Sequence, residues 1–423
     1  MKESIHIRNF AGIRVLDLDL ESIVVLIGPQ ASGKSITAKL LFFFKSFFNE
    51  IFRSIDKHET KRDLDKKQTE KFSNYFPRES WPKDFFKIEY KINNSWISIT
   101  KDINAPLKFD YSDDVKEMII RARKFYQSEE KKAALEPNKL SASYRANSNA
   151  RNKYYQCIKT EISEQASFTQ LFIPAGRSFY ANVQSGIFSF LSENKSLDPF
   201  LIEFGAFYES YKRFNISDIS EGRRRATDFD EIINSILNSR YLREKDKDYL
   251  VHEDNRKVNL ANASSGQQEI LPLIIILKVL SVIGFTGGGS TIYIEEPEAH
   301  LSPSAQKKIV QLLAKVFNGK KDEFQLIITT HSPYILASFN NLIQAGRIKS
   351  NSPNKLKSLY KIIPENEVIE PRSIVAYSMQ NGTKELLIDS ETHLISSNIL
   401  DAVSDEIAIE FGKMLDLEFD SET

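Results

Sequence analysis

One segment has the residue types needed to hold the phosphates of a nucleotide, namely Gly28-Pro29-Gln30-Ala31-Ser32-Gly33-Lys34-Ser35. It matches the phosphate-binding pattern G-x-x-x-x-G-K-[ST], in which backbone N–H groups surround the β-phosphate and a helix N-terminus adds a positive dipole end. We therefore expect Gly28–Ser35, together with Ile36, to bind a nucleotide. Lys34 would reach the β- and γ-phosphates, and the Ser35 hydroxyl would coordinate Mg²⁺. No Asn-Lys-x-Asp guanine-recognition segment is present, which favours ATP over GTP.

A second segment supplies carboxylates: Glu295-Glu296-Pro297-Glu298 follows the apolar run Thr291–Ile294. Phosphoryl transfer to water needs one carboxylate near the metal and a second that polarises the attacking water. We assign Glu295 to Mg²⁺ and Glu296 to the water. The alternative is a solvated acidic strand end. It is disfavoured because the pair follows a buried strand in the same α/β region as the phosphate-binding loop.

Two further segments are ambiguous when taken alone. Ala263–Glu269 opens a long apolar helix, and Ser265 could simply cap it, with Gln268 at the third helical position. His331 follows the predicted strand Gln325–Thr329, where a single histidine is most often structural or exposed to solvent.

The order of these four segments resembles that of ABC-type ATPases, in the branch that contains the SMC/RecF-like proteins and the OLD-family (AAA-15) ATPases. The stretches Glu295–Leu301 and Ile173-Pro174-Ala175-Gly176-Arg177 are especially similar to those of OLD-type proteins. The resemblance covers roughly residues 1–50 and 165–423 and leaves the intervening insertion unmatched. Ser302 departs from it, since a histidine often stands at that position.

Several roles are implied by this resemblance. Two ATPase heads would sandwich two nucleotides and form a homodimer or a higher oligomer, with Ala299–Ser302 crossing the interface. Ser264, Ser265 and Gly266 would contact the γ-phosphate of ATP held by the second subunit. His331 would be the switch histidine that touches the γ-phosphate. Arg177 would sense nucleotide, although an arginine bonded to the backbone of the sheet is an equally good interpretation.

The predicted elements that position these residues alternate between strands and helices, which indicates an α/β fold. Together with the resemblance, they predict an ABC/SMC-like P-loop ATPase head with a mostly parallel sheet, an antiparallel β piece and a helical insertion. We divide the chain into an N-terminal ATPase lobe (1–110), a basic helical insertion (111–165), a helical part of the head (166–260) and a C-terminal ATPase lobe (261–423).

Three local predictions are more specific. Residues 56–110 begin as a charged connector and end in a hairpin around Asn93-Asn94. The insertion contains the helices Asp113–Ala134 and Arg151–Ala166, joined by a Ser/Asn-rich loop at Ser141–Asn152. A C-terminal helix runs through about Asp401–Leu415.

The charge of the chain is balanced overall but not locally. Its 423 residues carry 57 Lys/Arg and 57 Asp/Glu, which argues against a globally basic nucleic-acid binder. However, Val115–Thr160 holds 11 basic and 4 acidic residues, a net charge of +7. Lys361–Thr423 holds 4 and 14, a net charge of −10. The basic insertion is a candidate surface for nucleic acid or for an acidic partner.

The remaining features concern location and partners. A single cysteine, Cys157, favours a reducing cytoplasm, and no apolar stretch is long enough to suggest a membrane span. The segment after His331 has no Asp-x-Asp metal constellation, so we expect no nuclease within this chain. ATPases of this kind resemble subunits of bacterial anti-phage systems such as Septu, PARIS and some retrons. In those systems a separate effector, a nuclease or a toxin, supplies the toxic or nucleolytic activity. The alternative is a DNA-repair or DNA-tethering ATPase.

Overall fold

The computed structural model describes residues 2–182, 197–212, 226–244, 247–282, 288–320 and 323–396, and the short pieces 409–410 and 413–414. Its centre is a six-stranded sheet with the strand order β14-β13-β3-β12-β11-β7. The strands of this sheet are β3 (Ile23–Ile27), β7 (Thr169–Ile173), β11 (Ser290–Glu295), β12 (Phe324–Thr330), β13 (Ile374–Gln380) and β14 (Thr383–Leu386). Neighbouring strands are parallel except for the β13–β14 pair.

Strand register brings the predicted functional segments to one edge of this sheet. Ile27, at the end of β3, pairs with Thr330 of β12, and Glu295, at the end of β11, pairs with Thr329. The carboxyl ends of parallel strands share an edge, so the loops that follow these three strands are neighbours. The alternating side chains of β3 enter two different cores. Val24 and Leu26 face one core, and Ile23, Val25 and Ile27 face the other.

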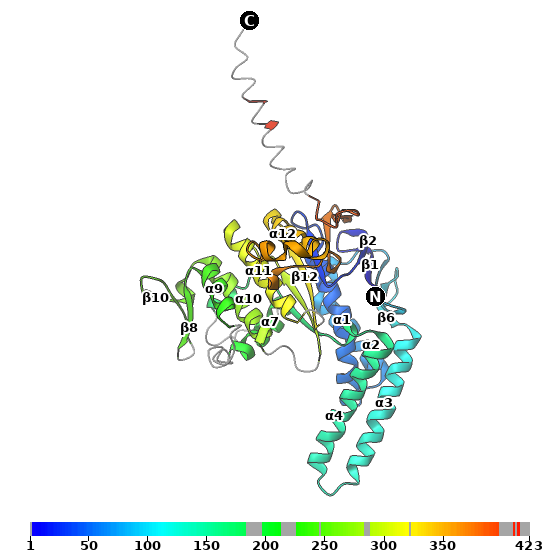
Figure 1. The fold of residues 1–423 in the computed structure, drawn as a ribbon. Helices are drawn as coiled ribbons and strands as arrows, with labels where there is room; N and C mark the ends of the chain where they lie inside the picture. The colour runs from blue at the N-terminus through cyan, green and yellow to red at the C-terminus, as the bar shows by residue number, and fades with distance from the viewer. Residues whose placement is uncertain are drawn as a thin grey trace.

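Helices cover both faces of the central sheet (Figure 1). The long P-loop helix α1 (Lys34–Asp56) packs on one face, and α10 to α12 pack on the other. The other helices of the head are α5 (Phe179–Asn182), α7 (Pro199–Lys212), α9 (Ala226–Leu237), α10 (Ser265–Val282), α11 (Pro303–Gly319), α12 (Pro333–Asn351) and α13 (Leu356–Leu359). Within the described ranges, no helix is both long and apolar enough to cross a membrane.

Two antiparallel sheets flank this core. The larger has the order β2-β1-β4-β5-β6 and shares an apolar core with the phenylalanine-rich side of α1. The smaller has the order β10-β9-β8 and lies at the far side of the molecule (Figure 1). Their strands are β1 (Glu3–Phe10), β2 (Ile13–Asp19), β4 (Phe86–Ile92), β5 (Ser95–Lys101), β6 (Lys108–Tyr111), β8 (Arg240–Glu244), β9 (Lys247–Val251) and β10 (Lys257–Asn259). The predicted fold class is confirmed: an α/β head with a mostly parallel sheet, an antiparallel β piece and a helical insertion.

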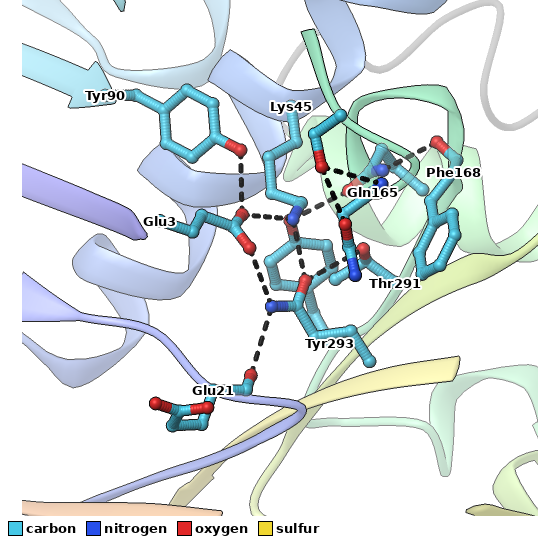
Figure 2. Close-up of polar contacts among 11 residues, drawn as sticks. Glu3, Glu21, Lys45, Tyr90, Gln165, Phe168, Thr291 and Tyr293 are labelled. Carbon is cyan, nitrogen blue, oxygen red and sulfur yellow. Dashed lines mark hydrogen bonds and ion pairs between the residues drawn. The ribbon is translucent and has the colours of Figure 1, made fainter. Parts of the chain in front are cut away.

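A buried polar cluster joins the two large sheets through α1 (Figure 2). The Lys45 ammonium donates to the Glu3 carboxylate of β1 and, at 2.7 Å, to Gln325 Oε1 of β12. Gln325 Nε2 returns a bond of 2.9 Å to Glu3 Oε2, and the Tyr90 hydroxyl donates to Glu3 Oε1 at 2.7 Å. Glu3 and Lys45 are each 1% exposed. Gln325 stands near the start of β12, so the cluster lies at the end of the sheet opposite the phosphate-binding loop.

The insertion is a helical hairpin, α3 (Asp113–Ala134) and α4 (Lys139–Cys157), which projects from the head (Figure 1). The predicted loop at Ser141–Asn152 is wrong, because these residues form most of α4. Their low helix propensity is outweighed by packing, since a stripe of small and aromatic residues is buried at helical spacing. The stripe consists of Ala142, Ala146, Ala150 and Tyr154.

The charged connector predicted after residue 56 is also wrong in part, because it contains helix α2 (Lys61–Tyr75). Thr60 and Asp63 form a reciprocal capping box at its start, and Leu64 and Phe72 are buried on its inner side. The C-terminal helix predicted through Asp401–Leu415 falls largely outside the described residues.

Candidate active site

The phosphate-binding loop lies between β3 and α1 in a backbone shape that only small residues permit. Gly28 and Gly33 have φ values of 154° and 96°. A Cβ atom on Gly28 would lie 2.1 Å from the carbonyl oxygen of Met379, and one on Gly33 would lie 2.9 Å from the Ile13 side chain. The loop is therefore enclosed by β13 and by the start of β2, and both glycines are required by close contacts.

The Lys34 ammonium lies inside the curve of this loop. It donates to the carbonyl oxygens of Gly28 and Pro29, both at 2.8 Å, and faces the Ser32 hydroxyl at 3.3 Å. Burial lowers the pKa of Lys34, while the nearby carboxylates of Glu296 and Glu298 oppose that shift. The ammonium is thus held where phosphate oxygens could replace the loop carbonyls as its acceptors.

Glu295, the last residue of β11, provides a candidate ligand for a cation. Its side chain is 6% exposed, and Oε2 accepts a bond of 3.3 Å from the backbone N–H of Ala175. Its other oxygen, Oε1, is buried without a hydrogen-bond partner in the part of the chain described here. A buried carboxylate oxygen that lacks a donor fits a hard divalent cation such as Mg²⁺. Ser35, in the first turn of α1, stands at the same edge of the sheet.

Glu296 follows in a strained backbone conformation, with a φ of 44°. This left-handed region is unusual for a residue with a side chain, and it is often found at functional sites. Its backbone N–H donates to the carbonyl of Thr329 at 2.9 Å. Its Oε1 lies 3.2 Å from His331 Nε2, and both side chains remain partly exposed. The structure therefore brings these two predicted catalytic residues into direct contact.

Glu298 is a site residue that the sequence analysis did not single out. Its Oε1 accepts bonds of 2.7 Å from the Thr330 hydroxyl and from the backbone N–H of His331. The side chain is 9% exposed. This carboxylate fixes the backbone that carries His331. The only sequence signal for that role is a third glutamate in Glu-Glu-Pro-Glu.

The Ser264–Gly266 segment forms the start of α10. Ser264 caps the helix, because its hydroxyl accepts from the backbone N–H of Gln267 at 3.3 Å and Gln267 Oε1 accepts from the Ser264 backbone N–H at 3.2 Å. The predicted capping pair, Ser265 and Gln268, is therefore displaced by one residue. Ser264 and Ser265 are exposed. A Cβ atom on Gly266 would lie 2.6 Å from the carbonyl oxygen of His300, so this glycine allows α10 to rest against the Ala299–Ser302 loop.

Arg177 is fully buried, at 0% exposure. Nη1 donates to the carbonyl oxygens of Pro174 (2.8 Å) and Glu295 (2.7 Å), and Nη2 donates to that of Glu296 (3.0 Å). Nε donates to the carbonyl oxygen of Glu269 at 3.0 Å, and Nη2 also faces the Glu269 carboxylate at 3.3 Å. These contacts match the alternative in which Arg177 is bonded to the backbone of the sheet, and they give no support to its assignment as a nucleotide contact.

Neither here nor elsewhere do the described residues contain a group of three or more His, Cys, Asp or Glu side chains arranged to hold a metal ion, so Glu295 is a single candidate carboxylate ligand. The nucleotide contacts assigned to Gly28–Ile36 and to Ser264–Gly266 remain predictions. What the structure shows is their placement. The phosphate-binding loop, the two catalytic candidates and the cation candidate meet at one edge of the sheet, and Ser264 and Ser265 stand exposed at the start of α10.

Comparison with known proteins identifies one family and several weaker similarities. The family model AAA_15, described as AAA ATPase domain, matches residues 1–336. A protein described as "Retron Ec83 probable ATPase" from Escherichia coli is 34% identical over 95 residues, which are 21% of this chain and 17% of that protein. The chain thus spans less than a fifth of the length of this relative.

Two solved structures match most of this chain at low identity. An SMC head domain with a coiled coil and joint from Pyrococcus yayanosii is 11% identical, with coverage of 95% of this chain and 99% of that one and a TM-score of 0.41. The recombination mediator protein RecF is 12% identical, with coverages of 92% and 98% and a TM-score of 0.31. The fold class rests on the strand order and the helix packing described above.

Proposed function

Because the chain belongs to the AAA_15 family of AAA ATPase domains, we propose that this ATPase acts as a molecular switch, closing into a nucleotide-bridged dimer that controls a separate effector. The contact between Glu296 and His331 at the end of β11, next to Lys34, carries the proposal. In this arrangement Lys34 contacts the β- and γ-phosphates. Glu296 polarises the attacking water, and His331 stands where it can touch the γ-phosphate.

Mg²⁺ would be held by the Ser35 hydroxyl and by Glu295, whose Oε1 lacks a protein partner among the described residues. When bound, it would neutralise charge on the β- and γ-phosphates. The protein keeps that carboxylate oxygen buried and free of a hydrogen-bond donor among the described residues. The backbone N–H of Ala175 holds only Oε2.

The catalytic assignment is tested with Glu296→Gln, Lys34→Ala and the control Glu253→Gln, which changes an exposed glutamate in the β9–β10 turn. Glu296→Gln should still bind ATP and lose about 10²–10⁴-fold in kcat, the usual contribution of a general base. Lys34→Ala should lose nucleotide binding, and Glu253→Gln should match wild type. Equal phosphate release by wild type and Glu296→Gln would refute the assignment.

The dimer is supported by the exposure of Ser264 and Ser265 at a helix start whose capping bonds stay within its own turn. Such residues are accessible to a second subunit. In sedimentation with ATP and Mg²⁺, we expect Glu296→Gln to have the mass of a dimer. Adding Ser265→Arg to Glu296→Gln should keep the protein monomeric. A Glu296→Gln protein that stays monomeric at saturating ATP would contradict the dimer.

A role in anti-phage defence is supported by the partial match to the retron-associated probable ATPase. The effector would be a nuclease or a toxin carried by another chain. We expect the ATP-locked Glu296→Gln variant to retain such a protein during purification from its native cells, and Lys34→Ala to release it. Identical recovery of partner by both variants would argue against ATP-controlled binding.

A second candidate function is DNA repair or tethering, favoured by the net charge of +7 on Val115–Thr160 in the projecting α3–α4 hairpin. Neutralising phosphates with Lys and Arg makes binding fall steeply with salt. DNA-stimulated hydrolysis that disappears between low and moderate salt, and that is weakened by Lys131→Ala with Lys132→Ala, would favour this candidate. ATPase activity that is indifferent to DNA would exclude it.

A further inference from the structure

The buried Arg177 guanidinium holds the backbone on both sides of the strained residue at the end of β11. Its Nη1 and Nη2 bond the carbonyl oxygens of Glu295 and Glu296 at 2.7 and 3.0 Å. Between these carbonyls the chain takes the left-handed φ of 44° at Glu296. Such a conformation persists only where surrounding contacts hold it in place. These two bonds, together with the bond from the Glu296 N–H to the Thr329 carbonyl, hold the backbone that directs the Glu296 side chain toward His331.

The same guanidinium is tied to the start of α10. The Glu269 carboxylate accepts the backbone N–H groups of Arg177 and Ser178 at 2.9 and 2.8 Å. The carbonyl of Glu269 accepts from Arg177 Nε at 3.0 Å. Glu269 is 1% exposed and lies one helical turn after the exposed Ser264 and Ser265. One side chain thus connects the end of β11 to the helix turn that follows these serines.

A second contact joins the same two segments. The absence of a side chain at Gly266 lets the first turn of α10 approach the His300 carbonyl, which would lie 2.6 Å from an added Cβ atom. His300 itself has a left-handed φ of 60° and follows Glu298, the carboxylate that holds the His331 backbone. The start of α10 and the loop after β11 are therefore connected twice, directly between Gly266 and His300 and indirectly through Arg177.

We propose that Arg177, held by Glu269, is a positioning residue for hydrolysis that fixes the Glu296 backbone to the second turn of α10. The inference rests on the role proposed above for Glu296. It has a mechanical consequence, because a shift of the α10 start, on engagement of Ser264–Gly266 by a second subunit, would move the hydrolytic carboxylate with it. The side chain acts through backbone atoms and makes no contact with ATP.

The chain offers a matched control, the equally buried pair Glu3–Lys45 at the opposite end of the sheet. Glu269→Gln and Glu3→Gln make the same chemical change in two buried ion pairs. We expect both to lower the Tm. Only Glu269→Gln should lower kcat, by about 10-fold or more, because displacements of about 1 Å in a catalytic group can cost 10²-fold. The KM for ATP should stay within about 2-fold, since the phosphate-binding loop is not altered.

Arg177→Lys extends the test, since it keeps the charge but cannot bond all of these oxygens. We expect it to lower kcat by about 10–100-fold, again with little change in KM. In the Glu296→Gln background, Arg177→Lys should add almost nothing, because both changes act through one carboxylate.

The outcomes separate the two proposals. If Glu296→Gln is inactive while Glu269→Gln and Arg177→Lys keep the wild-type kcat per folded molecule, the positioning role is wrong and the catalytic assignment stands. If Glu296→Gln is as active as wild type, the catalytic assignment itself fails. If Arg177→Lys does not fold, Glu269→Gln alone decides, with ATP binding as the measure of folded protein. A fall in kcat in Glu3→Gln equal to that in Glu269→Gln would also overturn the proposal.

Discussion

Two buried ion pairs, Glu3–Lys45 and Arg177–Glu269, lie at opposite ends of the mostly parallel central sheet. Glu3–Lys45 is surrounded by side-chain partners, Gln325 and the Tyr90 hydroxyl, and it joins α1 to both large sheets (Figure 2). Arg177–Glu269 bonds mainly to backbone, at the carboxyl ends of the strands. Burial is the same in both pairs, so burial of charge alone does not indicate function.

The difference lies in which atoms each pair holds. Lys45 fixes one helix against two sheets, at the amino ends of β11 and β12, where no candidate catalytic residue stands among the described residues. Arg177 fixes the carbonyls on either side of Glu296. In a parallel α/β sheet, ligands bind beyond the carboxyl ends of the strands. The first pair is therefore expected to affect stability alone, and the second to affect stability and turnover.

The largest effect is expected from removing one partner of the structural pair. Lys45→Met should reduce the free energy of unfolding by about 3–5 kcal/mol, because it leaves the Glu3 carboxylate buried without its counter-charge. Replacing both partners, as in Glu3→Leu with Lys45→Met, should recover part of that loss, because the Tyr90 hydroxyl then lacks its bond to Glu3 while Gln325 Nε2 keeps its bond to the Glu21 carbonyl. Urea denaturation measures both variants.

The corresponding double replacement in the second pair should recover less of the free energy of unfolding. Arg177→Met with Glu269→Leu should recover little, because carbonyl and N–H groups of the backbone lose their partners. Equal recovery in the two double variants would mean that the pairs do not differ in the way described.

A smaller effect, on turnover, is expected at Glu298, which also holds backbone at the carboxyl edge. Glu298→Gln should lower kcat by about 10–100-fold by loosening the bond to the His331 N–H. The matched control is Glu367→Gln, which changes another buried glutamate, paired with Lys315 at 3.3 Å and distant in sequence from the site. A steady-state phosphate assay compares the two. Equal kcat values for Glu298→Gln and Glu367→Gln would show that Glu298 has no role in positioning His331.

Tyr90→Phe should have a lesser effect and only on stability. It removes one hydroxyl bond to Glu3, which keeps Lys45 and Gln325 as partners. We expect a loss of about 1–2 kcal/mol in the free energy of unfolding, with kcat unchanged. A change in kcat beyond the error of the assay would show that the amino-end cluster reaches the catalytic edge.

The smallest effect is expected at an exposed pair in the hairpin, Arg145 with Glu136. Both side chains are about half exposed. Arg145→Ala should change the free energy of unfolding by no more than about 0.5 kcal/mol, since solvent screens such pairs. A loss comparable to that of Lys45→Met would show that burial does not set the cost of breaking an ion pair in this chain.

The sequence was sufficient to place the candidate site residues directly after predicted strands, because those strands have strong local signals. Continuous apolar runs before Gly28 and Glu295 indicate buried parallel strands, and such strands deliver their following loops to one edge. The fold class and the placement of Lys34, Glu296 and His331 follow from that.

The parts that could not be predicted depend on tertiary packing. Helix α4 has a poor local propensity and forms because Ala142 and Ala146 pack against Ala133 of α3, and Ala150 is buried in the large core. The role of Arg177 depends on which carbonyls the fold brings around it, and Glu298 acts on a residue 33 positions away. No periodicity or motif contains that information. The same holds for Glu3 and Gln325, whose bond spans 322 positions.

The central claim is that position at the carboxyl edge, and not burial, makes an ion pair matter for hydrolysis. Single-turnover cleavage of pre-bound ATP, measured side by side in Glu269→Gln and Glu3→Gln, tests it most directly. The account predicts that Glu3→Gln cleaves bound ATP at the wild-type rate and that Glu269→Gln is at least about 10-fold slower. Equal rates in the two variants would contradict it.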